Sequence, residues 1–326
     1  MEPTLKDWDK IAEESKQAWF THLSSWIFLE KSWLVKDYSF FIRDGEKVVG
    51  ICPLFLVSKK GFKYLTSGYK GWGGPAFIND APSNAVEGAY KYIDECAKQT
   101  KAIWIEINYP SIIQSTPPIL DYGYSCIRKR TSIIDLKNTE ENLLANIDKK
   151  CRYEIRKPEK LNLNVKFIEA KSLEEIKEYH KIHCENYSRT GTPPNPLWYF
   201  YGLFSLFNPF GIIKFFFVEL DGKKVAAASV AIWKNRAIYL TGASLDEALG
   251  KGLNNYLQWN IIKYLHNLGI NWYEMGEIET ESEKAKSLGK FKESFGGTEF
   301  ALFKGVKVYH PIKYKLFNLL RRIKSH

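Results

Sequence analysis

The sequence predicts an α/β protein made of two tandem copies of one unit. The same order of predicted strands and helices occurs twice, and the two occurrences share local sequence, RDGEKVVG with LDGKKVAA and YLTSG with YLTGA. The 326 residues are 45% apolar and 15% aromatic, which is enough for a sizeable core. A chain of this length also suits two domains.

In the first copy, YSFFIR is predicted to be a strand that ends in a tight turn at Asp44-Gly45. The segments VVGICPLFLV and FKYLTSG are predicted as the next two strands, and THLSSWIF as an earlier helix. A helix near 84–99 and the strand AIWIEIN complete the copy.

In the second copy, FFFVEL precedes a turn at Asp221-Gly222, and VAAASVAIW and AIYLTGAS follow as strands. A helix over 252–268 has one apolar face and ends at Gly269, before the strand NWYEMGE. A helix between two strands is a crossover, so an antiparallel meander should lead into a parallel pair. SLEEIKEYHKIHCENY is predicted to be a further helix, with a capping box from Ser172 to Glu175.

Composition and cysteine spacing indicate a cytoplasmic protein. No apolar run approaches the ~20 residues of a membrane-spanning helix, and the first residues do not resemble a signal peptide. Five scattered cysteines show neither metal-ligand spacing nor a paired framework, as is typical of reduced thiols. We expect no metal site.

The net charge of +10 is concentrated in two places. One is the middle of the chain, with Lys149, Lys150, Arg152, Arg156, Lys157 and Lys160, and the other is the last 26 residues, with seven cations and no acid. Such clusters attract the phosphates of RNA, nucleotides or lipids, and the alternative is a solvated helix face. The tail, VKVYHPIKYKLFNLLRRIKSH, suits an anionic membrane, tRNA phosphates or packing on the first domain.

Four stretches resemble the Fem-type aminoacyltransferases (the FemAB family), whose halves are similar to the GNAT acetyltransferase fold. They are RYEIRKPEKLNLNV, GLNNYLQWNIIKYLHNLGINWYEMG after YLTGAS, the signature KFKESFGG, and the glycine-rich SGYKGWGGP. The resemblance spans most of the chain and is strongest over 150–297. It implies two GNAT-like domains at 1–148 and 149–305, each a mixed central sheet flanked by helices. It also implies a basic carboxyl-terminal helix at 306–326 that packs on the first domain.

The resemblance also implies an activity, the transfer of an amino acid from aminoacyl-tRNA to an amine of a peptidoglycan precursor. Relatives of this size look like acyltransferases of the cell envelope or of surface polysaccharides. The donor, an aminoacyl-tRNA or an acyl-CoA, would be a co-substrate rather than a tightly bound cofactor. The protein would work in the cytoplasm or at the inner face of the membrane. Two residues depart from the family pattern: Pro158 should break or kink a helix, and Glu277 stands where glycine is common.

Acyl transfer to an amine passes through a tetrahedral oxyanion, which a fixed cation stabilises. Lys292 is the candidate, held on a turn by Gly296 and Gly297 and anchored by Phe291 and Phe295. The alternative is a surface lysine beside a turn. Lys290 would point elsewhere if the stretch is extended.

Carboxylates after the last core strand are candidates for a general base. Glu277 or Glu274 would accept a proton or bind the ammonium of an aminoacyl group, and the alternative is a solvated loop acid. Tyr239 and Tyr256 would bind substrate or lie in the core.

Several further residues are candidates for substrate binding. Arg189 would clamp a phosphate or carboxylate, or form a surface salt bridge. Between the two copies, a pyrophosphate-linked precursor or a tRNA end would suit Arg152, Arg156 and Lys157. The glycine-rich loop that resembles a family substrate loop carries Tyr69, Lys70 and Trp72.

Two other functions compete with the Fem type. An acetyl-CoA-dependent GNAT N-acetyltransferase acting on an amino sugar or another small amine needs backbone N–H groups at a helix start, usually after Arg or Gln. Here Glu247 occupies that position in EALGKGLNN, although Gly250 and Gly252 are present. A non-catalytic RNA- or membrane-binding protein would explain the charge, but neither the repeat nor KFKESFGG.

Overall fold

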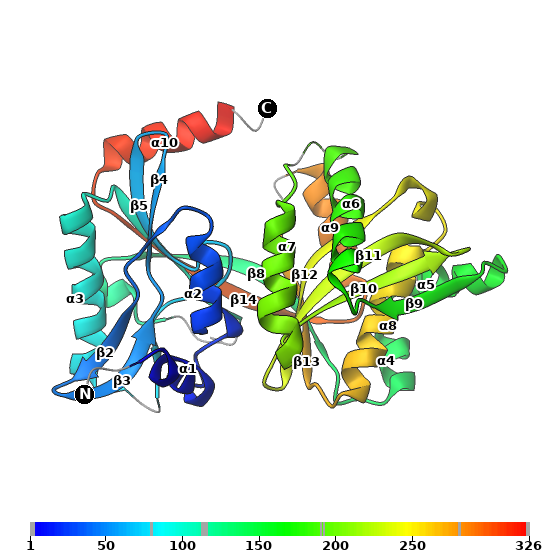
Figure 1. Ribbon diagram of the computed structural model, residues 1–326, viewed down its shortest axis with the longest axis horizontal. Coiled ribbons are helices and arrows are strands. Elements are labelled where there is room, and N and C mark those ends of the chain that lie inside the picture. The colour runs from blue at the N-terminus through cyan, green and yellow to red at the C-terminus, as the bar shows by residue number, and fades with distance from the viewer. Residues whose placement is uncertain are drawn as a thin grey trace. The chain divides into compact units, whose positions relative to one another are not determined.

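The computed structural model describes residues 4–78, 81–111, 117–189, 191, 193–279 and 282–323. The chain forms two compact units: unit 1 comprises Met1–Lys129 and Ala301–His326, and unit 2 comprises Arg130–Phe300 (Figure 1). The boundaries expected from the sequence were 148/149 and 305/306. The first division lies earlier because β8 (Ser125–Asp135) pairs with β13 (Trp272–Ile278), with Asp135 opposite Trp272.

Unit 1 contains strands of two sheets. In the first sheet, the strands of this unit lie in the order β1, β4, β5, β7, β14. In the second sheet, the order is β2, β3, β6. Their bounds are β1 Lys36–Asp37, β2 Phe40–Asp44, β3 Lys47–Cys52, β4 Phe55–Lys59, β5 Phe62–Ser67, β6 Ala76–Phe77, β7 Trp104–Asn108 and β14 Thr298–Val308. The single strand expected over 48–57 is therefore wrong. Pro53 separates β3 from β4, because proline cannot donate a ladder hydrogen bond.

The helices of unit 1 include the predicted crossover. They are α1 Leu5–Glu14, η1 Phe20–His22, α2 Ser24–Lys31, α3 Ser83–Thr100, η2 Leu120–Tyr122 and α10 Pro311–Ile323. α3 joins β5 to β7, which are parallel, with Leu65 opposite Ile105. α10 lies across this sheet, and residues 324–326 of the expected terminal helix lie outside the described residues.

The strands of unit 2 repeat this pattern with a longer meander. They are β9 Val165–Glu169, β10 Ile213–Leu220, β11 Lys223–Trp233 and β12 Arg236–Ser244, followed by β13. Neighbours from β9 to β12 are antiparallel, and β12 is parallel to β13. The expected order, a meander that leads into a parallel pair, is confirmed.

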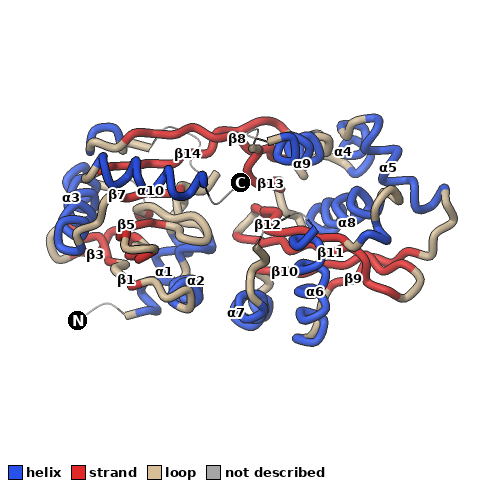
Figure 2. Tube along the Cα trace, turned by 90° about the horizontal axis from the view of Figure 1, so that it is seen from above, coloured by secondary structure: helices blue, strands red, loops and turns tan. Residues whose placement is uncertain are grey.

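The helices of unit 2 flank its sheet (Figure 2). They are α4 Glu140–Asn146, α5 Lys149–Lys160, α6 Leu173–Arg189, α7 Leu197–Phe207, η3 Asn208–Phe210, η4 Asp246–Ala248, α8 Leu253–Asn267 and α9 Glu283–Glu293. The expected cap of α6 is present, because the Glu175 N–H donates to Ser172 Oγ at 3.3 Å. The expected break at Pro158 is absent, because α5 continues through Pro158 and ends at Lys160.

Pro158 has a consequence for the start of α8. Because proline has no N–H, the Glu154 carbonyl receives no helical hydrogen bond from position 158. That carbonyl oxygen lies against Gly252, which has a φ of +74° and begins α8. A Cβ at position 252 would overlap it.

Gly252→Ala should therefore destabilise the protein more than Gly250→Ala does. Gly250 has a similar φ of +70°, but nothing lies within 4 Å of the Cβ it would gain. The control substitution should cost about 1–2 kcal/mol of backbone strain. Gly252→Ala should cost about 1–3 kcal/mol more, since α5 must move. Urea unfolding measures both losses, and equal losses would contradict the close packing of α5 on α8.

Candidate active site

A cavity opens in unit 2 where two parallel strands separate. Residues 236–238 of β12 pair with residues 272–274 of β13. Both strands continue beyond these residues, but they are no longer paired there. The cavity has a volume of about 780 Å³. It is lined by residues of α6, β11, β12, α8 and α9 and by the residue that follows β13. They are Asn186, Tyr187, Ala227, Tyr239, Gly242, Ala243, Ser244, Asn254, Leu257, Gln258, Glu279, Ser287, Leu288 and Phe291.

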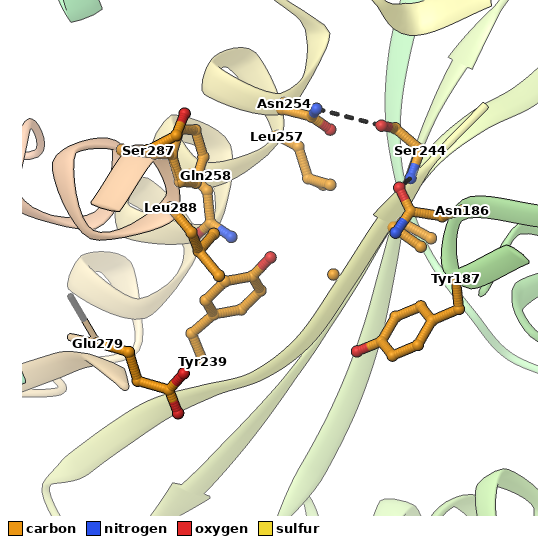
Figure 3. A pocket seen from close by; sticks show the side chains of 14 residues that line it. Asn186, Tyr187, Tyr239, Ser244, Asn254, Leu257, Gln258, Glu279, Ser287 and Leu288 are labelled. Atoms are coloured by element: carbon orange, nitrogen blue, oxygen red, sulfur yellow. Dashed lines mark hydrogen bonds between the residues drawn. The ribbon is translucent and has the colours of Figure 1, made fainter. Parts of the chain in front are cut away.

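Aromatic and amide side chains dominate the cavity. Tyr239 and Tyr187 extend into it from opposite sides (Figure 3). Asn254 Nδ2 donates to Ser244 Oγ at 3.2 Å, and Tyr273 donates to Gln258 Oε1 at 2.9 Å, so both amides are oriented. Burial raises the pKa of the Tyr239 phenol, which therefore stays neutral and able to donate a hydrogen bond.

The electrostatics of the cavity are unlike those of a phosphate site. Of the described residues that line it, Glu279 alone carries a charge. A carboxylate beside neutral amides and phenols favours a cation and repels a phosphate.

Lys292 lies where the two strands part, in the last turn of α9. Its Nζ donates to the Glu277 carbonyl oxygen at 2.6 Å and lies next to Gly276. The side chain is half-buried, and burial lowers the pKa of its ammonium, an effect that Glu279, Glu277 and Glu274 oppose. The neighbouring Phe291 lines the cavity, whereas Lys290 is exposed.

Gly296 and Gly297 have a structural role that differs from the one expected. KFKE is helical, so Lys292 is not held on a glycine turn. Phe295 is buried against the edge of Phe291, with ring centroids 5.2 Å apart. A Cβ at Gly296 would lie 2.6 Å from the Asn146 carbonyl oxygen, and one at Gly297 would overlap Ser132 Oγ. The glycines therefore let the end of α9 pack closely against α4 and β8.

The two candidate bases differ in their surroundings. Glu274 is buried and accepts a hydrogen bond from Thr131 Oγ1 at 2.9 Å, so it is not a solvated loop acid. The Gly276 carbonyl oxygen also lies 3.0 Å from Thr131 Oγ1, so the two acceptors compete for its single hydroxyl hydrogen. Glu277 is half-buried, and its own carbonyl holds Lys292.

Most of the cationic candidates are engaged with their neighbours. Arg189 pairs with Asp246 and donates to the Ser244 carbonyl and to Asn186 Oδ1, which positions a residue of the cavity. Arg152 donates to the carbonyls of Ala145 and Ile147 at 2.6 Å each, at the carboxyl-terminal end of α4. The remaining candidates outside the cavity lining are Lys157, which pairs with Glu154 at 3.3 Å, the exposed Arg156, and the half-buried Tyr256.

The glycine-rich loop of unit 1 is held by a buried carboxyl group. Glu30 Oε1 accepts hydrogen bonds from the Lys70 N–H and from Trp26 Nε1, each at 2.8 Å. Glu30 Oε2 accepts none from any residue that the structure describes. Burial raises the pKa of Glu30 to about 7.

The same loop presents its side chains next to other aromatic groups. Lys70 Nζ lies 4.1 Å from the ring centroid of Trp33, a cation–π contact. Thr21 Oγ1 donates to the Trp72 carbonyl at 2.6 Å, and Tyr69 is half-buried beside them.

Sequence reasoning missed seven polar residues of the cavity: Asn186, Tyr187, Ser244, Asn254, Gln258, Glu279 and Ser287. Asn254 and Gln258 lie one turn apart at the start of α8, where they point to one side of the helix. That spacing of two amides in the first turns of the helix was the available signal. No sequence signal marked Asn186 of α6 or Glu279 after β13, because only the fold brings these two segments together.

Comparisons with known proteins agree with this geometry. Residues 145–286 match the acetyltransferase (GNAT) domain family. Among curated proteins, none matches the chain in sequence. In described residues, no helix is long and apolar enough to cross a membrane.

Several solved structures share the fold over nearly the whole chain. A crystal structure of FemX has a TM-score of 0.76 at 16% identity, covering 97% of this chain and 98% of that one. L-PGS from Bacillus licheniformis has a TM-score of 0.62 at 14% identity, covering 98% and 97%. A tandem GNAT protein from the clavulanic acid biosynthesis pathway has a TM-score of 0.53 at 10% identity, covering 84% and 83%.

The domain match and the cavity define the class of protein: it is an acyltransferase with a GNAT-type domain in unit 2. The whole chain has the tandem GNAT-type architecture that the Fem-type resemblance implies.

Proposed function

We propose that the protein moves an aminoacyl or acyl group onto an amine of a cell-envelope precursor, of peptidoglycan or of a surface polysaccharide. The cavity at the fork of β12 and β13 carries this proposal, because a lysine ammonium lies at the fork and a carboxylate lines the cavity. The Fem-type signature KFKESFGG, which contains that lysine, supports the same reading.

In the proposed reaction, the acceptor amine attacks the carbonyl carbon of the donor ester or thioester. The C–N bond forms as the carbonyl π electrons move onto oxygen, and Lys292 stabilises that oxyanion. The C–O or C–S bond to the carrier then breaks as the carbonyl re-forms. The carrier leaves as its hydroxyl or thiol and takes up the proton that the attacking neutral amine loses. An amine that arrives as an ammonium must first lose a further proton, and Glu277 is the proposed acceptor of that proton.

The electrostatics favour an aminoacyl donor over acetyl-CoA. Glu279 suits the ammonium of an aminoacyl group. Glu247, in the position where acetyl-CoA enzymes usually have a cation, pairs with Lys223 in this structure. The carbonyl of Glu154 also lies against the first residue of the α8 cap, where a pyrophosphate would have to approach.

For the acceptor, the glycine-rich loop of unit 1 is the proposed binding element, through Tyr69, Lys70 and Trp72. Aromatic rings and one cation suit a sugar or peptide linked to a phosphate. The proposed place of work is the cytoplasm, with peripheral contact at the membrane where such precursors are assembled.

A thermal-shift experiment tests the donor. A ligand at 100 times its Kd should stabilise the protein by about 2.7 kcal/mol, which shifts the melting temperature by a few degrees. We expect a shift with aminoacyl-tRNA and none with acetyl-CoA or a nucleotide sugar alone. Leu288→Trp should reduce the shift by filling the cavity, whereas Leu268→Trp, at a similarly exposed leucine outside it, should not. Stabilisation by acetyl-CoA alone would favour the N-acetyltransferase alternative.

A further inference from the structure

The carboxyl-terminal helix α10 exposes a row of large apolar side chains. Ile312, Leu316, Leu319 and Leu320 expose 84%, 47%, 56% and 39% of their surface. With about 3.6 residues per turn, these four side chains fall within roughly 100° of the helix circumference. They therefore form one continuous stripe rather than scattered exposed residues.

The opposite side of α10 is attached to unit 1. Phe317 packs against Trp104, with ring centroids 4.7 Å apart, and against Phe62 at 5.4 Å. Tyr314 packs against Trp104 at 5.3 Å. Because aromatic contacts hold this side, the helix is fixed on its sheet (Figure 2) and the apolar stripe does not serve the fold.

Positive charge borders the stripe on both sides. On the helix circumference, Lys313 falls next to Leu320, and Lys315 falls next to Leu319. On the attached side of α10, Phe62 touches Phe317 and follows the exposed β4–β5 turn, which carries Lys59 and Lys60. Residues 301–326 contain no acidic residue.

We propose that this stripe of α10, with its bordering lysines, docks the protein onto an anionic lipid bilayer. Apolar side chains flanked by lysines are the pattern of a helix that lies in the membrane interface, with leucines among the acyl chains and ammonium groups at the lipid phosphates. A nucleic acid would use the lysines but would leave the leucines exposed to water. The inference does not depend on the proposed acyl transfer.

Vesicle flotation with the full chain tests the proposal. The probe is phosphatidylcholine vesicles with and without 30% phosphatidylglycerol. We expect binding to the anionic vesicles and at least about tenfold weaker binding to the neutral ones. Leu316→Ser/Leu319→Ser should lower the partition coefficient at least about tenfold, since two large apolar side chains are removed.

The matched control is Leu161→Ser/Leu268→Ser, which changes two leucines of unit 2 with 51% and 54% exposure. Lys313→Gln/Lys315→Gln should also weaken binding about tenfold, and Lys177→Gln/Lys181→Gln on α6 should not. Circular dichroism melts should be unchanged throughout, because all these side chains are exposed.

Four outcomes would overturn the proposal. One is equal binding to neutral and anionic vesicles, and another is equal loss in the α10 variants and their controls. The third is a dimer in light scattering that the leucine substitutions dissociate, with no vesicle binding, because the stripe would then join two copies. Binding of RNA in place of vesicles, sensitive to the lysines alone, would likewise contradict it.

Discussion

Lys292→Ala should lower the rate of acyl transfer by about 10²–10³ while leaving the protein folded. Removing one oxyanion donor typically has this effect, equivalent to about 3–4 kcal/mol of transition-state stabilisation. The loss should appear in kcat, because the negative charge on oxygen exists only in the transition state. Single-turnover transfer, with the donor identified by thermal shift, measures the rate.

The matched control is Lys290→Ala. Lys290 lies two residues away on α9, but its side chain is exposed. The activity of the unmodified enzyme should also fall as the pH is raised and Lys292 loses its proton. This fall should occur at a lower pH than that at which an ordinary lysine titrates, because burial lowers the pKa of Lys292. Full activity of Lys292→Ala would exclude this lysine from the mechanism.

The free energy of unfolding should fall by about 3 kcal/mol as pH rises from about 4.5 to about 7, through Glu30 alone. Its pKa rises from 4.5 to about 7 on folding, mainly by burial, although hydrogen bonds from Lys70 and Trp26 act in the other direction. In this pH window the folded protein binds more protons than the unfolded chain. Stability therefore decreases with pH, by about 1.4 kcal/mol for each pH unit of the shift.

Glu30→Gln should remove that dependence, because the amide does not titrate. Relative to the unmodified protein, the variant should gain about 3 kcal/mol between pH 4.5 and pH 7 in urea unfolding. Glu14→Gln is the control, since Glu14 is exposed and pairs only loosely with Lys10, at 3.8 Å. Parallel stability curves for Glu30→Gln and the unmodified protein would show that Glu30 is ionised in both states.

The repeated architecture was predictable because it rests on local signals. The Asp221-Gly222 turn has positive φ at both residues, 51° and 82°, as such a hairpin requires. Apolar spacing predicted α8, and a helix between two strands implied the parallel pair of β12 and β13. The capping box at Ser172 predicted the start of α6, because it too is a local signal, formed by residues only three positions apart.

The details of the site were less accessible, because they depend on packing between distant segments. Gly296 and Gly297 suggested a turn that presents a lysine, but their role is set by Asn146 and Ser132, far away in sequence. Arg152 was expected to bind a pyrophosphate-linked precursor or a tRNA end, but it donates to the carbonyls of Ala145 and Ile147. A sequence pattern shows which side chains are charged, but not which carbonyl groups lie within reach of them.

The chain leaves unit 1 within β8 and returns to it within β14, which pairs with β7 from Asn108 opposite Lys304 to Trp104 opposite Val308. During translation, the whole span 130–300 must be made before that return. At about 5–20 residues per second, a ribosome needs roughly 10–30 s for this span. For that time the nascent β7 has β5 on one side but lacks β14 on the other, and an unpaired strand edge attracts other extended chains. The order of synthesis therefore leaves this strand edge open until β14 has been made.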